Sequence, residues 1–316
     1  MDSESKSVAV AEDRISALPD AVLSRIISCI DPKLTKCAVR TSILSKRWKN
    51  MWASVPNLYF DDNDFSSAAD FIAFVDHALQ IRDSLAIRKF GIAFSRFEHC
   101  DEALSHIDDW ISTAARCHVV VLALRVDTDG DKIFDLPKSL FSCKTLTALK
   151  LGVNFIINIP TSECFPRLKS LHLTFYKPRV VCPAYDSIDF SYFRVLEHLT
   201  ILGSFGYGGF NFNISLSELK TLRINLFAGH GRDAVYSFLI NAPKLETLDV
   251  SEGLLSDYTF ENTNSLVEAN IKVIYDTYEQ AVSANLTTKL LAGISGVKCL
   301  YTYLQSPLLK VSLHYN

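Results

Sequence analysis

The feature that most restricts the fold of this chain is a repeated pattern, L-x-x-L-x-L, in which other aliphatic or aromatic residues can replace leucine. Seven clear copies follow one another, the pattern is weaker at Leu266, and it is degenerate at Val297. From the second copy to the eighth, successive starts lie 27, 22, 28, 23, 26 and 21 residues apart. The seven clear copies begin at Ile87, Val119, Leu146, Leu168, Leu196, Leu219 and Leu245.

This spacing predicts a stack of strands. The two apolar residues of L-x-L fall on one face of a strand, because successive side chains point to opposite faces. A single repeat cannot bury that face, so stacked repeats form a parallel sheet over one continuous core. Steps of roughly 20–29 residues are typical of leucine-rich repeats. The variable step, with an asparagine after the strand only at Asn154, indicates an irregular array with heterogeneous connecting segments.

The residues before the repeats have a different pattern. Residues 1–12 are polar and are expected to form a disordered tail. After Pro19, apolar residues recur at three- and four-residue steps, which predicts an amphipathic helix. A second apolar set around Val39, and a pair of tryptophans at Trp48 and Trp52, predict two more short helices. Three short helices bury little core, so this module is expected to need a partner for stability.

Together these patterns predict an α/β chain in four parts. Residues 1–12 form the tail, residues 13–60 the three-helix module and residues 61–85 a helical connector. Residues 86–316 form an irregular leucine-rich-repeat solenoid with a curved parallel sheet. Helical periodicity is present at residues 66–82 and again at 101–116.

Charge and cysteine content argue against several classes of protein. The formal net charge is -3, so no overall basic field indicates nucleic-acid binding. The first residues lack the apolar stretch of a secretory signal, and no run of 18 apolar residues indicates a membrane span. The eight cysteines contain no C-x-x-C pair and are too sparse for a disulfide scaffold. We therefore expect reduced thiols in a protein of the cytosol or the nucleus.

Motifs for catalysis or metal binding are incomplete or missing. Lys132 replaces the glycine that a calcium loop beginning at Asp127 needs, and His99 and His106 have no third ligand nearby. The glycine-rich stretches 206–209 and 229–232 do not match a phosphate loop and are expected to be turns. No nucleophile motif such as G-x-S-x-G occurs. We expect no catalytic residue, no metal site and no cofactor.

The helical module resembles a known domain. The stretches DRISALPDAVLSRII at residues 13–27 and AVRTSILSKRW at residues 38–48, followed by Trp52, resemble the F-box of plant F-box/leucine-rich-repeat proteins of the FBD-associated type. The repeat region, including Trp110-Ile111 and residues 290–297, is similar to the same family. The sequence departs from the family pattern at three points. The loop at 31–36 is slightly longer than usual, and Cys37 stands where an acidic residue is common. The given sequence ends at Asn316, where members of the family often continue into an FBD segment.

The resemblance implies a division of labour. The F-box of such proteins binds a Skp-type adaptor, which docks on a cullin scaffold with its RING subunit, and the repeats hold a target protein for ubiquitination. Ubiquitin transfer belongs to other subunits, so no catalytic residue is implied. The alternative for each adaptor residue is that it fills the core of the module itself. The residues implied to contact the adaptor are Leu18, Pro19, Leu23, Ile26, Val39, Leu44 and Trp48.

The target-binding face is predicted from the repeat geometry. The residue between the two apolar strand positions points away from the core, and the curved sheet surface is the usual binding site of a solenoid. The alternative is ordinary solvation of a polar sheet face. Ala123 occupies this position in the second repeat, and the candidate target-binding residues are Lys150, His172, Thr200, Arg223, Asp249 and Asn270.

Two other functions remain open from the sequence. The first is a sensor that holds a small molecule or hormone in the concave side of the repeats, which requires a deep cavity with converging basic groups. The second is a repeat scaffold whose helical module does not engage an adaptor, which co-purification with the adaptor would distinguish.

Overall fold

The structure is a computed structural model, and it describes the chain from Ile15 to Tyr315 with gaps. The described residues are 15, 18–29, 35–44, 48–82, 86–96, 101–127, 136–153, 164–176, 187–204, 210–226, 236–252, 256–274, 288–306 and 309–315. The expected tail, residues 1–12, lies outside them.

Three short helical segments form the N-terminal module, as predicted. Helix α1 spans Asp20–Ser28 and begins after Pro19, whose fixed backbone angle suits a helix start. Helix α2 spans Thr35–Arg40 and continues into the 3-10 turn η2 at Thr41–Ile43. The third segment, η3 at Trp48–Ser54, is a 3-10 helix. Both of its tryptophans are buried.

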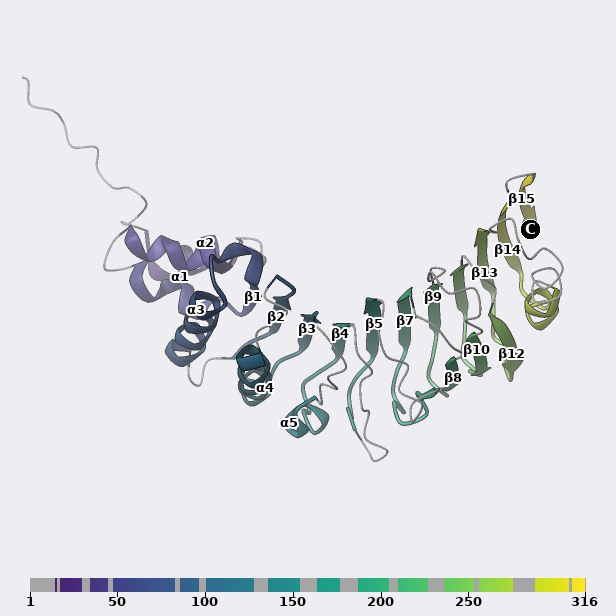
Figure 1. Ribbon diagram of the computed structural model, residues 1–316, viewed down its shortest axis with the longest axis horizontal. Coiled ribbons are helices and arrows are strands. Elements are labelled where there is room, and N and C mark those ends of the chain that lie inside the picture. Colours follow the sequence, from purple (N-terminus) through teal and green to yellow (C-terminus); the bar gives the residue numbers. More distant parts are fainter. Residues whose placement is uncertain are drawn as a thin grey trace, which may run out of the picture.

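An eleven-stranded sheet runs through the rest of the molecule and curves as an arc (Figure 1). Its strands pair in parallel, except that the last two are antiparallel. Their order is β1 (Asn57–Asp61), β2 (Lys89–Phe94), β3 (Val121–Val126), β4 (Ala148–Val153), β5 (Ser170–Tyr176), β7 (His198–Ser204), β9 (Thr221–Leu226), β11 (Thr247–Glu252), β13 (Glu268–Ile274), β14 (Cys299–Ser306) and β15 (Leu309–Tyr315).

The repeated pattern places the core as predicted. Every copy from Ile87 to Val297 corresponds to one parallel strand, β2 to β14. In the copy that contains β4, for example, Leu146, Leu149 and Leu151 are all buried. The equivalent residues of neighbouring strands are in register, so Leu149 lies opposite Leu122 and Leu171. One continuous core follows, and it also includes Leu23 and Trp52 of the N-terminal module.

The boundary predicted at residue 86 is too late, because the sheet already begins with β1. Val55, Leu58 and Phe60 form one more copy of the pattern, 32 residues before Ile87, and all three are buried. Pro56 inside this copy indicated only the end of a helix. The expected connector 61–85 therefore follows the first repeat strand and does not precede the sheet.

Helices cover the outer side of the arc next to β1 to β4 (Figure 1). Helix α3 (Ala68–Ile81) begins at Ser67, whose hydroxyl accepts a hydrogen bond from the Asp70 amide at 3.1 Å. Helix α4 spans Asp101–Arg116 and the short α5 spans Lys138–Phe141. The rings of Phe71 in α3 and Trp110 in α4 meet edge to face, with centroids 5.7 Å apart. The helices predicted at 66–82 and 101–116 are confirmed.

Farther along, a second parallel sheet replaces the helices on the outer side. Its strands are β6 (Ser187–Asp189), β8 (Phe210–Ser215), β10 (Tyr236–Asn241) and β12 (Asp257–Glu261). The rings of Phe212, Phe238 and Tyr258 stack between these strands, with centroids 4.5 and 5.0 Å apart and nearly parallel planes. The sequence analysis did not predict this sheet.

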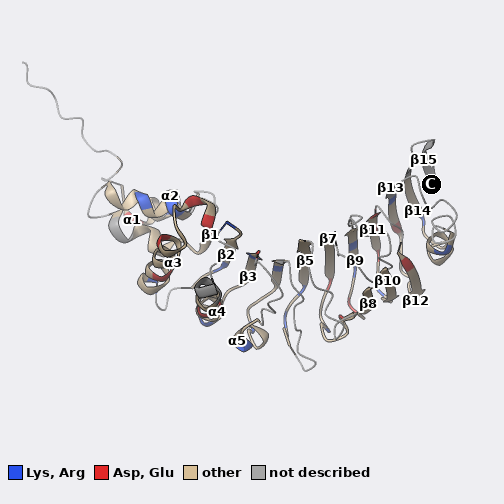
Figure 2. Ribbon diagram, viewed as in Figure 1, with Lys and Arg blue, Asp and Glu red and all other residues tan. Residues whose placement is uncertain are grey.

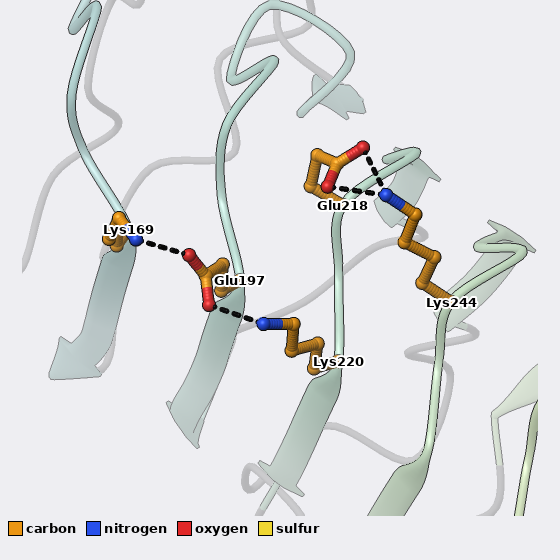
Figure 3. Close-up of polar contacts among 5 residues, drawn as sticks. All are labelled: Lys169, Glu197, Glu218, Lys220 and Lys244. Carbon is orange, nitrogen blue, oxygen red and sulfur yellow. Dashed lines mark hydrogen bonds and ion pairs between the residues drawn. The ribbon is translucent and has the colours of Figure 1, made fainter.

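Ion pairs connect residues of successive repeats at the edge where the strands begin (Figure 3). The Glu197 carboxylate lies 2.6 Å from the Lys169 ammonium and 2.8 Å from that of Lys220. These two hydrogen bonds lower the pKa of Glu197 to about 2. Lys244 pairs with Glu218 at 2.7 Å one repeat later. Ion pairs this exposed contribute little energy each, so the continuous apolar core holds the repeats together.

A buried carboxyl group at the end of β11 contacts residues at the start of β12. Glu252 is 1% exposed, and it accepts hydrogen bonds from the Ser256 amide at 2.9 Å, the Ser256 hydroxyl at 3.0 Å and the Tyr258 hydroxyl. Burial raises the pKa of Glu252 to about 7, although the three hydrogen bonds oppose the shift. The native state therefore keeps a proton that the unfolded chain loses near its ordinary pKa of 4.5.

We expect this site to make folding stability fall as the pH rises from about 4.5 to about 7, since unfolding then releases the proton. Glu252→Gln stays neutral and can keep all three contacts. Relative to this variant, the free energy of unfolding of the wild type should fall by about 3 kcal/mol between these two pH values. Urea unfolding at a series of pH values measures the difference. Glu268→Gln, at an exposed position of β13, is the control and should leave the slope unchanged. Parallel pH profiles for the wild type and Glu252→Gln would contradict a protonated buried carboxyl.

Within the described ranges, no helix is long and apolar enough to cross a membrane.

Candidate functional site

Exposed apolar side chains concentrate in the N-terminal module. Among the described residues, ten large apolar side chains are exposed, and five of them lie between Ile15 and Leu44. Leu44 is 60% exposed and Ile43 is 85% exposed, immediately after α2. We call the five residues the F-box apolar set: Ile15, Val22, Ile26, Ile43 and Leu44. Such a concentration of exposed apolar side chains on a small module is typical of a surface that binds another protein.

Helix α1 has apolar residues on both its inner and its outer side. Leu23 and Ile27 face inward and are fully buried, whereas Val22 and Ile26 are 41% and 43% exposed. Apolar residues on the outer side of a nine-residue helix have no role in the core of the chain. They are therefore free to contact a partner, as in helix-in-groove recognition.

The structure divides the residues predicted to contact the adaptor into three groups. Pro19, Ile26 and Leu44 are exposed, and Leu18 and Val39 are half-buried against the core. Two predictions need correction: Leu23 is 0% exposed and Trp48 is 3% exposed, so both hold the module together from inside. The sequence analysis missed the exposure of Ile15, Val22 and Ile43, although the helical periodicity of residues 22–26 carried part of that signal.

The module is fixed to the first repeat by buried polar contacts. The Arg82 side chain, 1% exposed at the end of α3, donates hydrogen bonds to the carbonyl groups of Trp52, at 3.4 Å, and Ala53. Burial lowers the pKa of Arg82 to about 10. The Tyr59 amide donates to the Thr35 hydroxyl at 2.8 Å, which ties β1 to α2. The helices and the sheet are therefore joined without a flexible linker at this point.

The predicted target-binding residues form one row across the open face of the sheet. Lys150, His172, Thr200, Arg223, Asp249 and Asn270 lie opposite one another from β4 to β13 in strand register. Their common row and outward direction are confirmed, and their binding role stays a prediction. The Arg223 guanidinium pairs with the Asp249 carboxylate at 2.9 Å. Figure 2 shows basic and acidic residues interspersed along the arc.

A hollow of about 170 Å³ opens on this face over β1 to β5, and we call it the sheet hollow. Its lining includes two of the predicted residues, Lys150 and His172. It also includes Tyr59, Arg125 and Tyr176, which the sequence analysis did not single out. Three outward positions in this region carry a small residue: Gly91, Ala123 and Gly152. These small residues were the sequence signal that could have predicted the hollow.

Other candidate chemistry finds no support in the described ranges. No group of three or more His, Cys, Asp or Glu residues there could hold a metal ion. The His106 imidazole lies 3.4 Å from the Asp76 carboxylate, which also accepts a hydrogen bond from Trp110 at 2.6 Å. His99, the loop after Asp127 and the stretches 206–209 and 229–232 lie outside the described residues. Six described cysteines are free thiols.

Comparison with known proteins accounts for both halves of this geometry. A profile of the F-box domain matches residues 15–60, and a profile of the leucine-rich repeats of FBD-associated F-box protein At5g56370 matches residues 107–263. The chain belongs to the F-box/leucine-rich-repeat family. The first profile covers the whole F-box apolar set, and the second contains most of the sheet face.

Individual relatives of this F-box/leucine-rich-repeat chain come from Arabidopsis thaliana. The F-box/LRR-repeat protein At3g59200 is 29% identical over 94% of the chain and 60% of the relative. The F-box/FBD/LRR-repeat protein At5g56420 is 30% identical over 89% of the chain and 65% of the relative. The chain thus spans about 60% of the length of the curated relatives it matches. No solved structure matches the chain.

Proposed function

We propose that this F-box/leucine-rich-repeat chain is a substrate-recognition subunit of a cullin-RING ubiquitin ligase. Its F-box binds a Skp-type adaptor, and its repeats hold a target protein. The chain itself supplies no catalytic group in this proposal, since the transfer of ubiquitin belongs to the other subunits. We place the complex in the cytosol or the nucleus.

The observation that carries the proposal is the F-box apolar set. Ile26 and Leu44 are exposed on a domain that the F-box profile matches, whereas Leu23 and Ile27 of the same module are buried. Buried apolar anchors supply most of the energy of a typical interface. An adaptor that covers this set removes exposed apolar area from water and stabilises the complex.

The sheet face supports a protein target more than a small molecule. Pockets for drug-sized ligands measure roughly 300–1,000 Å³, and the sheet hollow measures about 170 Å³. The row from Lys150 to Asn270 extends over six strands and carries both signs of charge. A long, mixed polar surface suits an extended segment or a protein surface.

We expect the full chain, co-expressed with an Arabidopsis Skp-type adaptor, to elute with it in a single size-exclusion peak at equal molar amounts. Without the adaptor, the exposed apolar set should make the chain prone to aggregation. Light scattering on both preparations measures the two outcomes. A monodisperse lone chain that does not co-elute with any Skp-type adaptor tested would overturn the proposal and favour a repeat scaffold.

A further inference from the structure

The sheet hollow is the part of the target face with the most defined geometry. Two tyrosine rings border it, and each covers a glycine. A side chain at Gly91 would collide with the Tyr59 ring at 2.4 Å, and one at Gly152 would lie 3.0 Å from the Tyr176 ring. The glycines therefore let both rings lie against the sheet, and the hollow stays open between them.

Arg125 is held in place beside this hollow. Its guanidinium lies over the Tyr176 ring, 5.0 Å from the centroid, and 3.5 Å from the Asp127 carboxylate. The ring contact and the ion pair restrict the Arg125 side chain, and they leave some of its guanidinium N–H groups available to a ligand. The same ion pair offsets much of the charge of Arg125, so the net positive charge of the hollow comes from other groups.

Lys150 supplies that charge. Lys150 is exposed in the hollow, and no carboxylate within the described ranges forms an ion pair with it. His172, directly opposite Lys150 in the register, is half-buried. Burial lowers the pKa of His172, and the positive charges of Lys150 and Arg223 lower it further. Only the second part of this shift reflects the positive charges beside the imidazole, which a bound anion would neutralise.

We propose that the sheet hollow binds an anionic side chain, a carboxylate or a phosphoryl group, presented by an acidic segment of the target protein. Lys150 provides the charge, Arg125 provides oriented N–H donors, and the tyrosine rings exclude water from the sides. The assignment to a target rests on the proposed function. A volume of about 170 Å³ fits one side chain, and the adjoining row toward Thr200 offers polar contacts to the rest of the segment.

Titration of the full chain with model peptides tests the proposal. The probes are hexaglutamate, a phosphoserine peptide of the same length, and hexaglutamine as the neutral control. We expect both anionic peptides to bind at least about 10-fold more tightly than hexaglutamine in calorimetry. Tighter binding of the phosphoserine peptide assigns a phosphorylated target, and equal or tighter binding of hexaglutamate assigns an acidic one.

A matched pair of charge reversals locates the site. Lys150→Glu should weaken hexaglutamate binding about 10-fold. Lys272→Glu makes the same change of charge on β13 of the same sheet, next to Tyr303 and away from the hollow, and should change the affinity less than about twofold. Nuclear magnetic resonance provides a second reading, because a bound anion should raise the pKa of His172. Lys150 and Arg223 act on the charge of that imidazole, and the other titratable groups that line the hollow are Arg125, Tyr59 and Tyr176.

Equal binding of the three peptides, or equal losses for Lys150→Glu and Lys272→Glu, would overturn the anion site. Adaptor co-elution measured on the same preparations separates this failure from failure of the proposed function. A chain that binds the adaptor but does not distinguish the peptides refutes the anion site alone. A chain that distinguishes the peptides but binds no adaptor refutes the ligase assignment and leaves the anion site standing.

Discussion

Replacing Ile26 and Leu44 together with aspartate is expected to weaken adaptor binding by at least about 100-fold. Central apolar anchors of an interface each contribute about 2 kcal/mol or more, and a carboxylate at such a position also loses water without gaining a partner. Both side chains are more than 40% exposed, so the folded module should tolerate the change. Biolayer interferometry with an immobilised Skp-type adaptor measures the loss.

The control for this variant is Leu239→Asp. Leu239 is 38% exposed on β10, an exposure close to that of Ile26, but it lies in the outer sheet and far from the F-box in the sequence. This substitution should leave the adaptor affinity within about twofold of the wild type. Circular dichroism confirms that both proteins are folded. Undiminished adaptor binding by the folded Ile26→Asp, Leu44→Asp double variant would refute the role of the F-box apolar set.

Phe238→Ala is expected to lower the free energy of unfolding by about 3–5 kcal/mol, the largest stability effect that we predict. Phe238 is 1% exposed, and its ring stacks between Phe212 and Tyr258 across three strands of the outer sheet. Removing the central ring deletes two stacking contacts and leaves a cavity that rigid strands cannot fill. Urea unfolding followed by tyrosine fluorescence measures the change.

The neighbouring residue provides the matched control. Leu239 follows Phe238 on the same strand, points the other way and is 38% exposed. Leu239→Ala removes apolar volume one position away, yet it should cost less than about 1 kcal/mol because it opens no cavity. Similar losses for the two variants would mean that the aromatic stack does not hold the outer sheet together.

The inner sheet could be predicted because its signal is periodic. Buried pairs such as Leu171 and Leu173, two residues apart, recur at steps that stacking requires, so each copy supports the others. The first strand escaped notice because Pro56 interrupts its copy and the preceding residues are helical. The outer sheet has no such regular spacing. Its pairs, for example Phe210 and Phe212, indicate strands only when their neighbours in space are known.

The candidate binding surfaces also differ in how far the sequence could predict them. The row from Lys150 to Asn270 follows from counting along each repeat, and the register confirms it. The sheet hollow depends on where the Tyr176 ring lies relative to Gly152, which belongs to a neighbouring strand. In the F-box, Leu23 and Val22 are adjacent apolar residues with opposite exposure. The family resemblance named contact residues, but only packing against η3 decides which side of α1 faces inward.

In the proposed ligase, the buried Arg82 contacts would affect which lysines of a target can be modified. Because the Arg82 side chain at the end of α3 donates hydrogen bonds to the carbonyl groups of Trp52 and Ala53, the F-box and the repeats would move as one rigid unit in that complex. A rigid receptor would hold its target at a fixed distance and orientation relative to the adaptor. Selection among acceptor lysines would then depend on how a captured protein is oriented, and hinge motion within the receptor would contribute little to it.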